Sequence, residues 1–87
     1  MNVGGQHERA KRLGQLLATV IREYEQTGEP VPRADVLRQA QREWGLTEAK
    51  VREYLIVLVD DHLLREIPPD TSAGITGTYL IPYPPRA

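Results

Sequence analysis

The densest group of side chains able to do chemistry is Asp60-Asp61-His62, in which two carboxylates precede an imidazole. On a helix, the two carboxylates would point about 100° apart and His62 would fall on the apolar side. The other histidine, His7, lies far away in the sequence, and the chain contains no cysteine. A metal ion would therefore lack a third ligand. We predict no metal site and no catalytic residues here, only an exposed acidic end to a helix.

The remaining sequence contains no glycine-rich phosphate loop, no constellation of paired carboxylates and no nucleophile. An enzyme requires such a constellation. We expect a binding protein without enzymatic activity and without a cofactor. No apolar run approaches the roughly 20 residues that cross a bilayer, and the first residues lack the apolar segment of a signal peptide. These features predict a cytoplasmic protein with no membrane partner.

The charge balance is close to neutral. The chain has 87 residues, the length of one domain, with 11 basic and 12 acidic residues and a formal net charge of -1. Strong nucleic-acid binders usually carry an excess of positive charge. In a nearly neutral chain, nucleic-acid binding therefore depends on whether the basic side chains share one face. Most of them are arginine, which suits bidentate contacts with phosphate and guanine, although genomic base composition alone also raises arginine usage.

Hydrophobic periodicity predicts a first helix from Gln6 to Gln26. Its apolar residues recur at spacings of three and four: Ala10, Leu13, Leu16, Leu17, Val20, Ile21 and Tyr24. Gly14 within this helix costs on the order of 1 kcal/mol relative to alanine, which indicates the close approach of another helix. Glycine and two prolines in residues 27–32 end the helix and leave a short edge strand around Val31.

A second helix is predicted from Arg33 to Trp44, with Val36, Leu37 and Ala40 facing the core. Gly45 can then adopt a positive φ and end this helix. The hydroxyl of Thr47 can cap the third helix by accepting from its free N–H groups. The third helix buries one side, with Val51, Tyr54, Leu55, Leu58, Val59 and His62, and exposes the other, with Glu48, Ala49, Arg52, Glu53 and Ile56.

Residues 63–68 and 78–82 are rich in branched and aromatic side chains and predict two antiparallel strands. The intervening loop, residues 69–77, is too long for a tight hairpin and has no lysine or arginine. In DNA-binding proteins, a loop between two strands that enters a minor groove usually presents a positively charged side chain. This loop is therefore suited to backbone or hydroxyl contacts with phosphate.

These elements predict a mainly α fold with a small β-hairpin, the three-helix winged helix-turn-helix of the α+β class. Residues 6–82 would form this domain. Residues 1–5 would be a flexible N-terminus, and residues 83–87 a Pro-rich C-terminal tail.

Several motifs are similar to those of the winged-helix domain of GntR-type bacterial regulators, over residues 9–82. They are Val31-Pro32, Gly45-Leu46-Thr47, Val51-Arg52-Glu53-x-Leu55, Leu58, Leu63 and Gly77-Thr78-Tyr79-Leu80. In that family the residue before the third helix caps it and contacts the DNA backbone, and the arginine reads bases or phosphates. The resemblance implies these roles for Thr47 and Arg52, and implies that residues 77–79 return the chain from the wing.

We therefore expect a sequence-specific DNA-binding protein, a regulator of transcription or replication, with its third helix in the major groove of double-stranded DNA. The candidate DNA-binding residues are Arg38, Arg42, Thr47, Glu48, Ala49, Lys50, Arg52, Glu53, Gly77 and Thr78. A homodimer formed through the first helix or the tail would double the phosphate contacts. The near-neutral charge and the uncharged loop leave one alternative open, a winged-helix module that binds another protein or dimerises without DNA.

Overall fold

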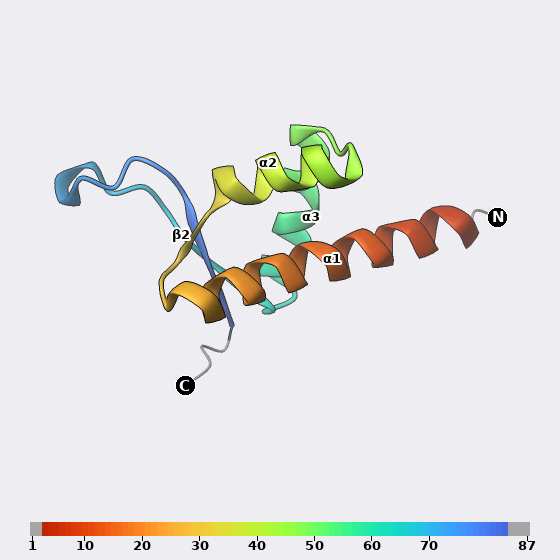
Figure 1. The fold of residues 1–87 in the computed structure, drawn as a ribbon, viewed down its shortest axis with the longest axis horizontal. Helices are drawn as coiled ribbons and strands as arrows, with labels where there is room; N and C mark the ends of the chain where they lie inside the picture. Colours follow the sequence, from red (N-terminus) through yellow and green to blue (C-terminus); the bar gives the residue numbers. More distant parts are fainter. Residues whose placement is uncertain (1–2, 84–87) are drawn as a thin grey trace.

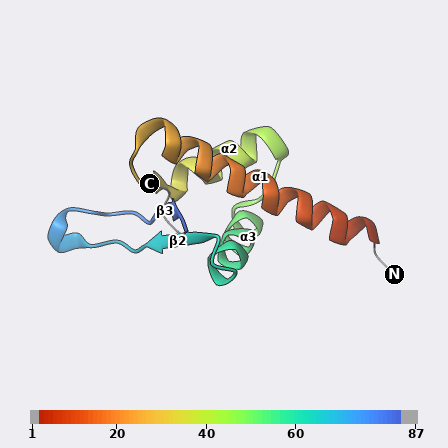
Figure 2. The same ribbon diagram turned by 90° about the horizontal axis from the view of Figure 1, so that it is seen from below.

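The structure is a computed structural model that describes residues 3–83. Along the chain it contains α1 (Val3–Thr27), β1 (Val31–Pro32), α2 (Arg33–Trp44), α3 (Glu48–Asp60), β2 (Leu64–Ile67), a short 3-10 helix (Thr71–Ala73) and β3 (Tyr79–Pro82). We call β2, β3 and the residues between them the wing. The wing and the first half of α1 project from opposite ends of the molecule (Figures 1 and 2). The predicted winged helix-turn-helix arrangement is confirmed.

The sheet contains three strands in the order β1-β3-β2, and both pairings are antiparallel. Val31 pairs with Leu80, and the N–H of Arg33 donates to the carbonyl of Thr78 at 2.9 Å. The predicted edge strand at Val31 is thus confirmed. Pro32 is tolerated in it because an edge strand needs ladder hydrogen bonds on one side only. These contacts attach the start of α2 to the base of the wing.

One core joins all three helices to the sheet. Leu16 and Val20 of α1 and Leu80 of β3 have no exposed surface. Around them are buried Val31, Val36, Ala40, Val51, Tyr54, Leu55, Leu58 and Leu64. Fully burying each of the larger side chains contributes about 1.5–3 kcal/mol, so this cluster is the main source of stability in a domain this small.

The beginning of α1 differs from the prediction. The helix begins at Val3 and not at Gln6, so residues 3–5 of the expected flexible N-terminus are helical. Residues 1–2, and residues 84–87 of the expected tail, lie outside the described residues.

Two expectations for the side chains of α1 are wrong. Ala10 is exposed and does not continue the buried stripe. Gly14 is also exposed, and no neighbouring segment described by the structure lies within 4 Å of the position that a Cβ would take. Packing against another described segment of the same chain therefore does not explain why glycine occupies this position.

The turn between α2 and α3 is formed by the residues predicted for it. Gly45 has a φ of 64°, and its N–H donates to the carbonyl of Gln41 at 3.1 Å. The hydroxyl oxygen of Thr47 accepts a hydrogen bond from the N–H of Lys50 at 3.2 Å. Together these contacts end α2 and set the direction in which α3 begins.

The expectation that His62 lies on the apolar side of α3 is wrong. The helix ends at Asp60, and His62 is exposed with a φ of 60°. Its N–H donates to the carbonyl of Val59 at 3.0 Å, and the N–H of Leu63 donates to the carbonyl of Leu58 at 2.9 Å. This is a Schellman termination, in which glycine usually occupies the left-handed position. A histidine there carries the steric cost of its Cβ.

Replacing this histidine tests the account of the helix end. We expect His62→Gly to raise the free energy of unfolding by about 0.5–1 kcal/mol, because glycine has no Cβ to clash in the left-handed conformation. The control is Asp61→Gly at a φ of -83°, which should lower stability because flexibility increases without relief of strain. Urea denaturation measures both. Destabilisation by His62→Gly would show that its ring contact with Tyr83, at 6.1 Å between centroids, matters more than the strain.

Candidate nucleic-acid interface

The exposed side of α3 carries the residues predicted for it. Glu48, Ala49, Lys50, Arg52 and Glu53 are all exposed. They project from a helix whose opposite side is buried in the core. The side chains are therefore available to a partner, as a recognition helix requires.

The charges on this face neutralise one another within α3. Arg52 donates to the carboxylate of Glu48 at 2.8 Å, and Lys50 lies 3.2 Å from the carboxylate of Glu53. The ammonium group of Lys50 also lies 5.7 Å from the centre of the Tyr54 ring. All four charged side chains are about half exposed, so these pairs are weak surface interactions worth about 0–1 kcal/mol each. A phosphate can replace the carboxylate partner at little cost.

A groove of about 400 Å³ lies where α2, α3 and the wing meet. We call it the wing groove. Its lining residues are Pro32, Arg33, Ala34, Leu37, Glu48, Arg52, Thr76, Gly77, Thr78 and Tyr79. It brings together four of the predicted DNA-binding residues, two from the start of α3 and two from the wing. Residues separated by about 25 positions in the sequence thus share one surface.

The wing groove also contains a residue that the sequence analysis missed. Arg33 is half-buried at the first position of α2, and its N–H is held by Thr78 of the wing. No ion pair joins it to a carboxylate within the part of the chain that the structure describes. Its position after Pro32 was a usable signal, because a proline followed by a helix start places the next side chain at the exposed N-terminal turn.

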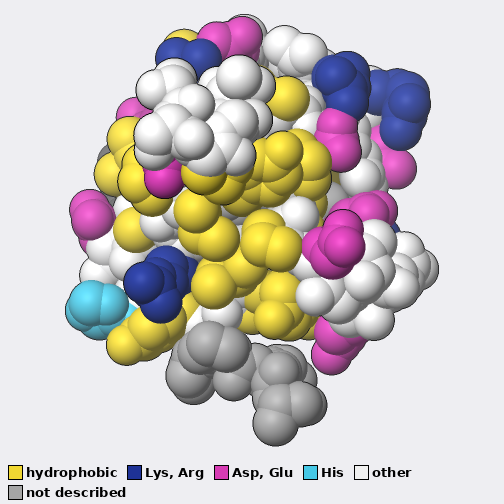
Figure 3. All heavy atoms as spheres, turned by 90° about the vertical axis from the view of Figure 1, so that its left-hand side faces the viewer, with side chains coloured by type: hydrophobic (Ala, Val, Ile, Leu, Met, Phe, Trp, Pro, Cys, Tyr) yellow, Lys and Arg dark blue, Asp and Glu magenta, His cyan; other side chains and the backbone are white. Residues whose placement is uncertain are grey.

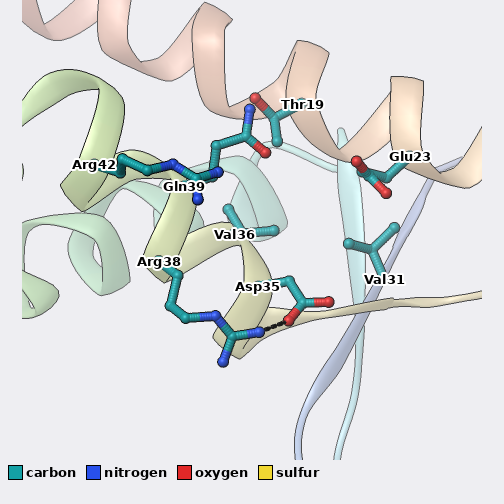
Figure 4. Close-up of a pocket in the computed structure, with 8 residues that line it drawn as sticks. All are labelled: Thr19, Glu23, Val31, Asp35, Val36, Arg38, Gln39 and Arg42. Atoms are coloured by element: carbon teal, nitrogen blue, oxygen red, sulfur yellow. Dashed lines mark hydrogen bonds and ion pairs between the residues drawn. The ribbon is translucent and has the colours of Figure 1, made fainter.

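Arg38 and Arg42 lie elsewhere. Both line a separate polar pocket of about 330 Å³ between α1 and α2, with Thr19 and Glu23 of α1 (Figure 4). Arg38 forms an ion pair with Asp35 on its own helix. Neither arginine lines the wing groove, so the structure separates these two candidates from Arg52.

Hydrophobic side chains gather in the middle of the face seen from the wing side (Figure 3). An apolar hollow of about 320 Å³ under the wing is lined by Glu29, Pro30, Ile67, Ile75 and Tyr79. A second apolar hollow on α3 is lined by Ala49, Ile56 and Val57 beside charged residues, and Ile56 is 57% exposed. These hollows are the features least typical of a DNA-binding surface.

The wing tip is ordered by Asp70. Its carboxylate accepts hydrogen bonds from the N–H of Ser72 at 3.2 Å and from the Ser72 hydroxyl at 2.6 Å. The backbones of Asp70 and Ile75 exchange two further hydrogen bonds, of 2.9 Å and 2.8 Å. The hydrogen bond from the Ser72 side chain lowers the pKa of Asp70 below its ordinary value. The long loop predicted between the two strands therefore has a tip that hydrogen bonds hold in a turn.

The tip should respond to acid. The pKa of Asp70 is lower in the folded state than in the unfolded state. Its hydrogen bonds therefore stabilise the wing at pH values above the unfolded-state pKa. This stabilisation is lost as the pH falls through the folded-state pKa. We expect carboxyl-carbon NMR to show Asp70 titrating below an aspartate in an unstructured peptide, and Ser72→Ala to raise its pKa. The same midpoint in both proteins would contradict this account.

The cap of α3 can be tested separately. Thr47→Ala removes the acceptor for the Lys50 N–H and should lower the free energy of unfolding by about 1 kcal/mol. Thr47→Ser keeps the hydroxyl and should remain close to the original stability. Thermal unfolding followed by circular dichroism measures both variants. Equal losses would show that the methyl group, not the hydrogen bond, stabilises this turn.

Within residues 3–83 no group of His, Asp or Glu side chains is arranged to hold a metal ion. None of the helices described there combines the length and apolar composition of a membrane-spanning segment. No protein-family model, curated protein or solved structure matches the chain. What the protein does is therefore inferred from the geometry of its own surfaces.

Proposed function

We propose that this protein is a small cytoplasmic DNA-binding regulator of transcription or replication, similar to the winged-helix domains of GntR-type regulators. The observation that carries the proposal is the wing groove, whose lining includes Arg33 of α2, Arg52 of α3 and residues 76–79 of the wing. In this proposal the exposed side of α3 enters the major groove, and the wing groove receives the adjacent phosphates.

The wing groove has the chemistry that a phosphate requires. Arg33 and Arg52 supply two positive charges against the single carboxylate of Glu48. The groove also includes the hydroxyl-bearing Thr76 and Thr78. The first turn of α3 adds backbone N–H groups without intrahelical acceptors, at the positive end of the helix dipole. The residues that carry these groups line or adjoin one groove although the whole chain is nearly neutral.

Base contacts would come from the centre of the exposed side of α3. Arg52 can donate two hydrogen bonds to guanine once it leaves Glu48. Glu48 can in turn accept from the amino group of cytosine. The ion pair of the free protein would then open into contacts with a guanine or a phosphate and with a cytosine.

The proposal predicts different effects for three arginines. Arg52→Ala should weaken binding to a duplex selected from a random library by about 1–3 kcal/mol. Arg33→Ala should weaken binding to all sequences similarly and lower the salt slope by about 1, as expected for a phosphate contact. Arg42→Ala, the same change of charge on the α1 side of α2, is the matched control and should have a smaller effect. Fluorescence anisotropy measures all three. Equal losses of DNA affinity in all three variants would mean that binding does not depend on the wing groove in particular.

A second function, recognition of another protein, is favoured by the apolar hollow around Ile56 on α3. A protein partner would bury this side chain, whereas a DNA groove offers little apolar surface apart from thymine methyl groups. Absence of DNA binding by the original protein even at low salt would favour this alternative.

A further inference from the structure

The polar pocket between α1 and α2 is a second place where a ligand could bind. We call it the α1–α2 pocket, and its volume of about 330 Å³ suits a small molecule. Thr19 and Glu23 line it from α1, and Gln39 and Arg42 line it from α2 (Figure 4). It shares no lining residue with the wing groove. An inference about this pocket therefore does not depend on DNA binding.

The charges of the α1–α2 pocket balance, but only half of them are paired. Its charged side chains are Glu23, Asp35, Arg38 and Arg42. Asp35 and Arg38 form an ion pair with each other. Glu23 and Arg42 form no ion pair within the part of the chain that the structure describes. Glu23 is half-buried, so its carboxylate has lost part of its hydration and gains from a positively charged partner. The pocket thus offers one negative and one positive group to a ligand.

The two unpaired charges lie at opposite ends of the pocket. Figure 4 shows Gln39 and Arg42 at one end, and Glu23 and Val31 at the other. Val36 lies between the two ends, and both valines are buried. Each turn of a helix advances about 5.4 Å, so residues on successive turns hold charges several ångströms apart. A ligand that reaches both charges must therefore carry its own charges on a short apolar chain.

We propose that the α1–α2 pocket binds a small zwitterion, with an ammonium group and a carboxylate at the two ends of a short alkyl chain. The ligand carboxylate accepts from the guanidinium of Arg42 and from the amide of Gln39, whose hydrogen bond to Glu43 is long at 3.5 Å. The ligand ammonium donates to the carboxylate of Glu23. The alkyl chain covers Val36. A ligand with a single charge leaves the opposite charge of the pocket unpaired and binds more weakly.

The ligand class is tested with 4-aminobutyrate, by NMR titration of the backbone amide signals of the protein. Butyrate and butylamine keep the alkyl chain but carry one charge each, and glycine holds its two charges close together. We expect a Kd of about 1 mM or tighter for 4-aminobutyrate, and at least tenfold weaker binding of the other three compounds. Weaker binding of 4-aminobutyrate, or equal binding of any of the three, overturns the proposal.

The assignment of the two ends is tested by removing one charge at a time. Glu23→Gln should weaken binding of 4-aminobutyrate at least tenfold and leave butyrate binding unchanged, because butyrate reaches only the Arg42 end. Arg42→Gln should weaken binding of both compounds. The matched controls are Glu25→Gln on α1 and Arg65→Gln on β2, which remove the same charges from exposed positions outside the pocket.

Both controls should bind 4-aminobutyrate like the original protein, and circular dichroism checks that every variant is folded. Unchanged affinity in folded Glu23→Gln or Arg42→Gln overturns the proposal. Equal losses in the controls also overturn it, because they would show a response to net charge and not to the pocket.

Discussion

The packing of β3 against α1 is the interaction on which the rest of the structure depends. Leu80 is completely buried against a core that includes Leu16 and Val20, and β3 is also the central strand that pairs with both β1 and β2. Without this strand, β1 would not hold the start of α2 beside the wing. The wing groove would then lose one of its three walls. A domain of this size has no second core that could compensate.

The core therefore explains how a nearly neutral chain can present a local positive site. The overall balance of charge says little about binding when the fold gathers particular groups. Arg33 and Arg52 line the same groove although they lie on different helices, whereas Asp60 and Asp61 lie at the C-terminal end of α3 and do not line it. Within α3, Arg52 pairs with Glu48 and Lys50 with Glu53, and these exposed pairs are weak enough for a phosphate to replace the carboxylates.

Local signals predicted much of the fold. The bounds of α2 agree with the prediction because Pro32 and Gly45 act through their own backbone geometry, and the cap at Thr47 does so too. The end of α3 was missed because His62 adopts a left-handed conformation that its residue type does not signal. The early start of α1 was missed because the chain continues as a helix through Gly4 and Gly5 despite their low propensity.

The candidate site was only partly predictable. Exposure of α3 followed from periodicity, but the grouping with Arg33 depends on β1, which is only two residues long and pairs with a strand almost 50 positions later. The helical phase of α2 likewise places Arg38 and Arg42 at the pocket shared with α1 and outside the wing groove.

The most direct test of the account is titration of the protein into a labelled mixed-sequence duplex at several salt concentrations. Micromolar affinity that falls with salt, at a log-log slope of roughly -0.9 per phosphate neutralised, is the predicted result. No binding even at low salt would contradict the assignment of the wing groove as a phosphate site.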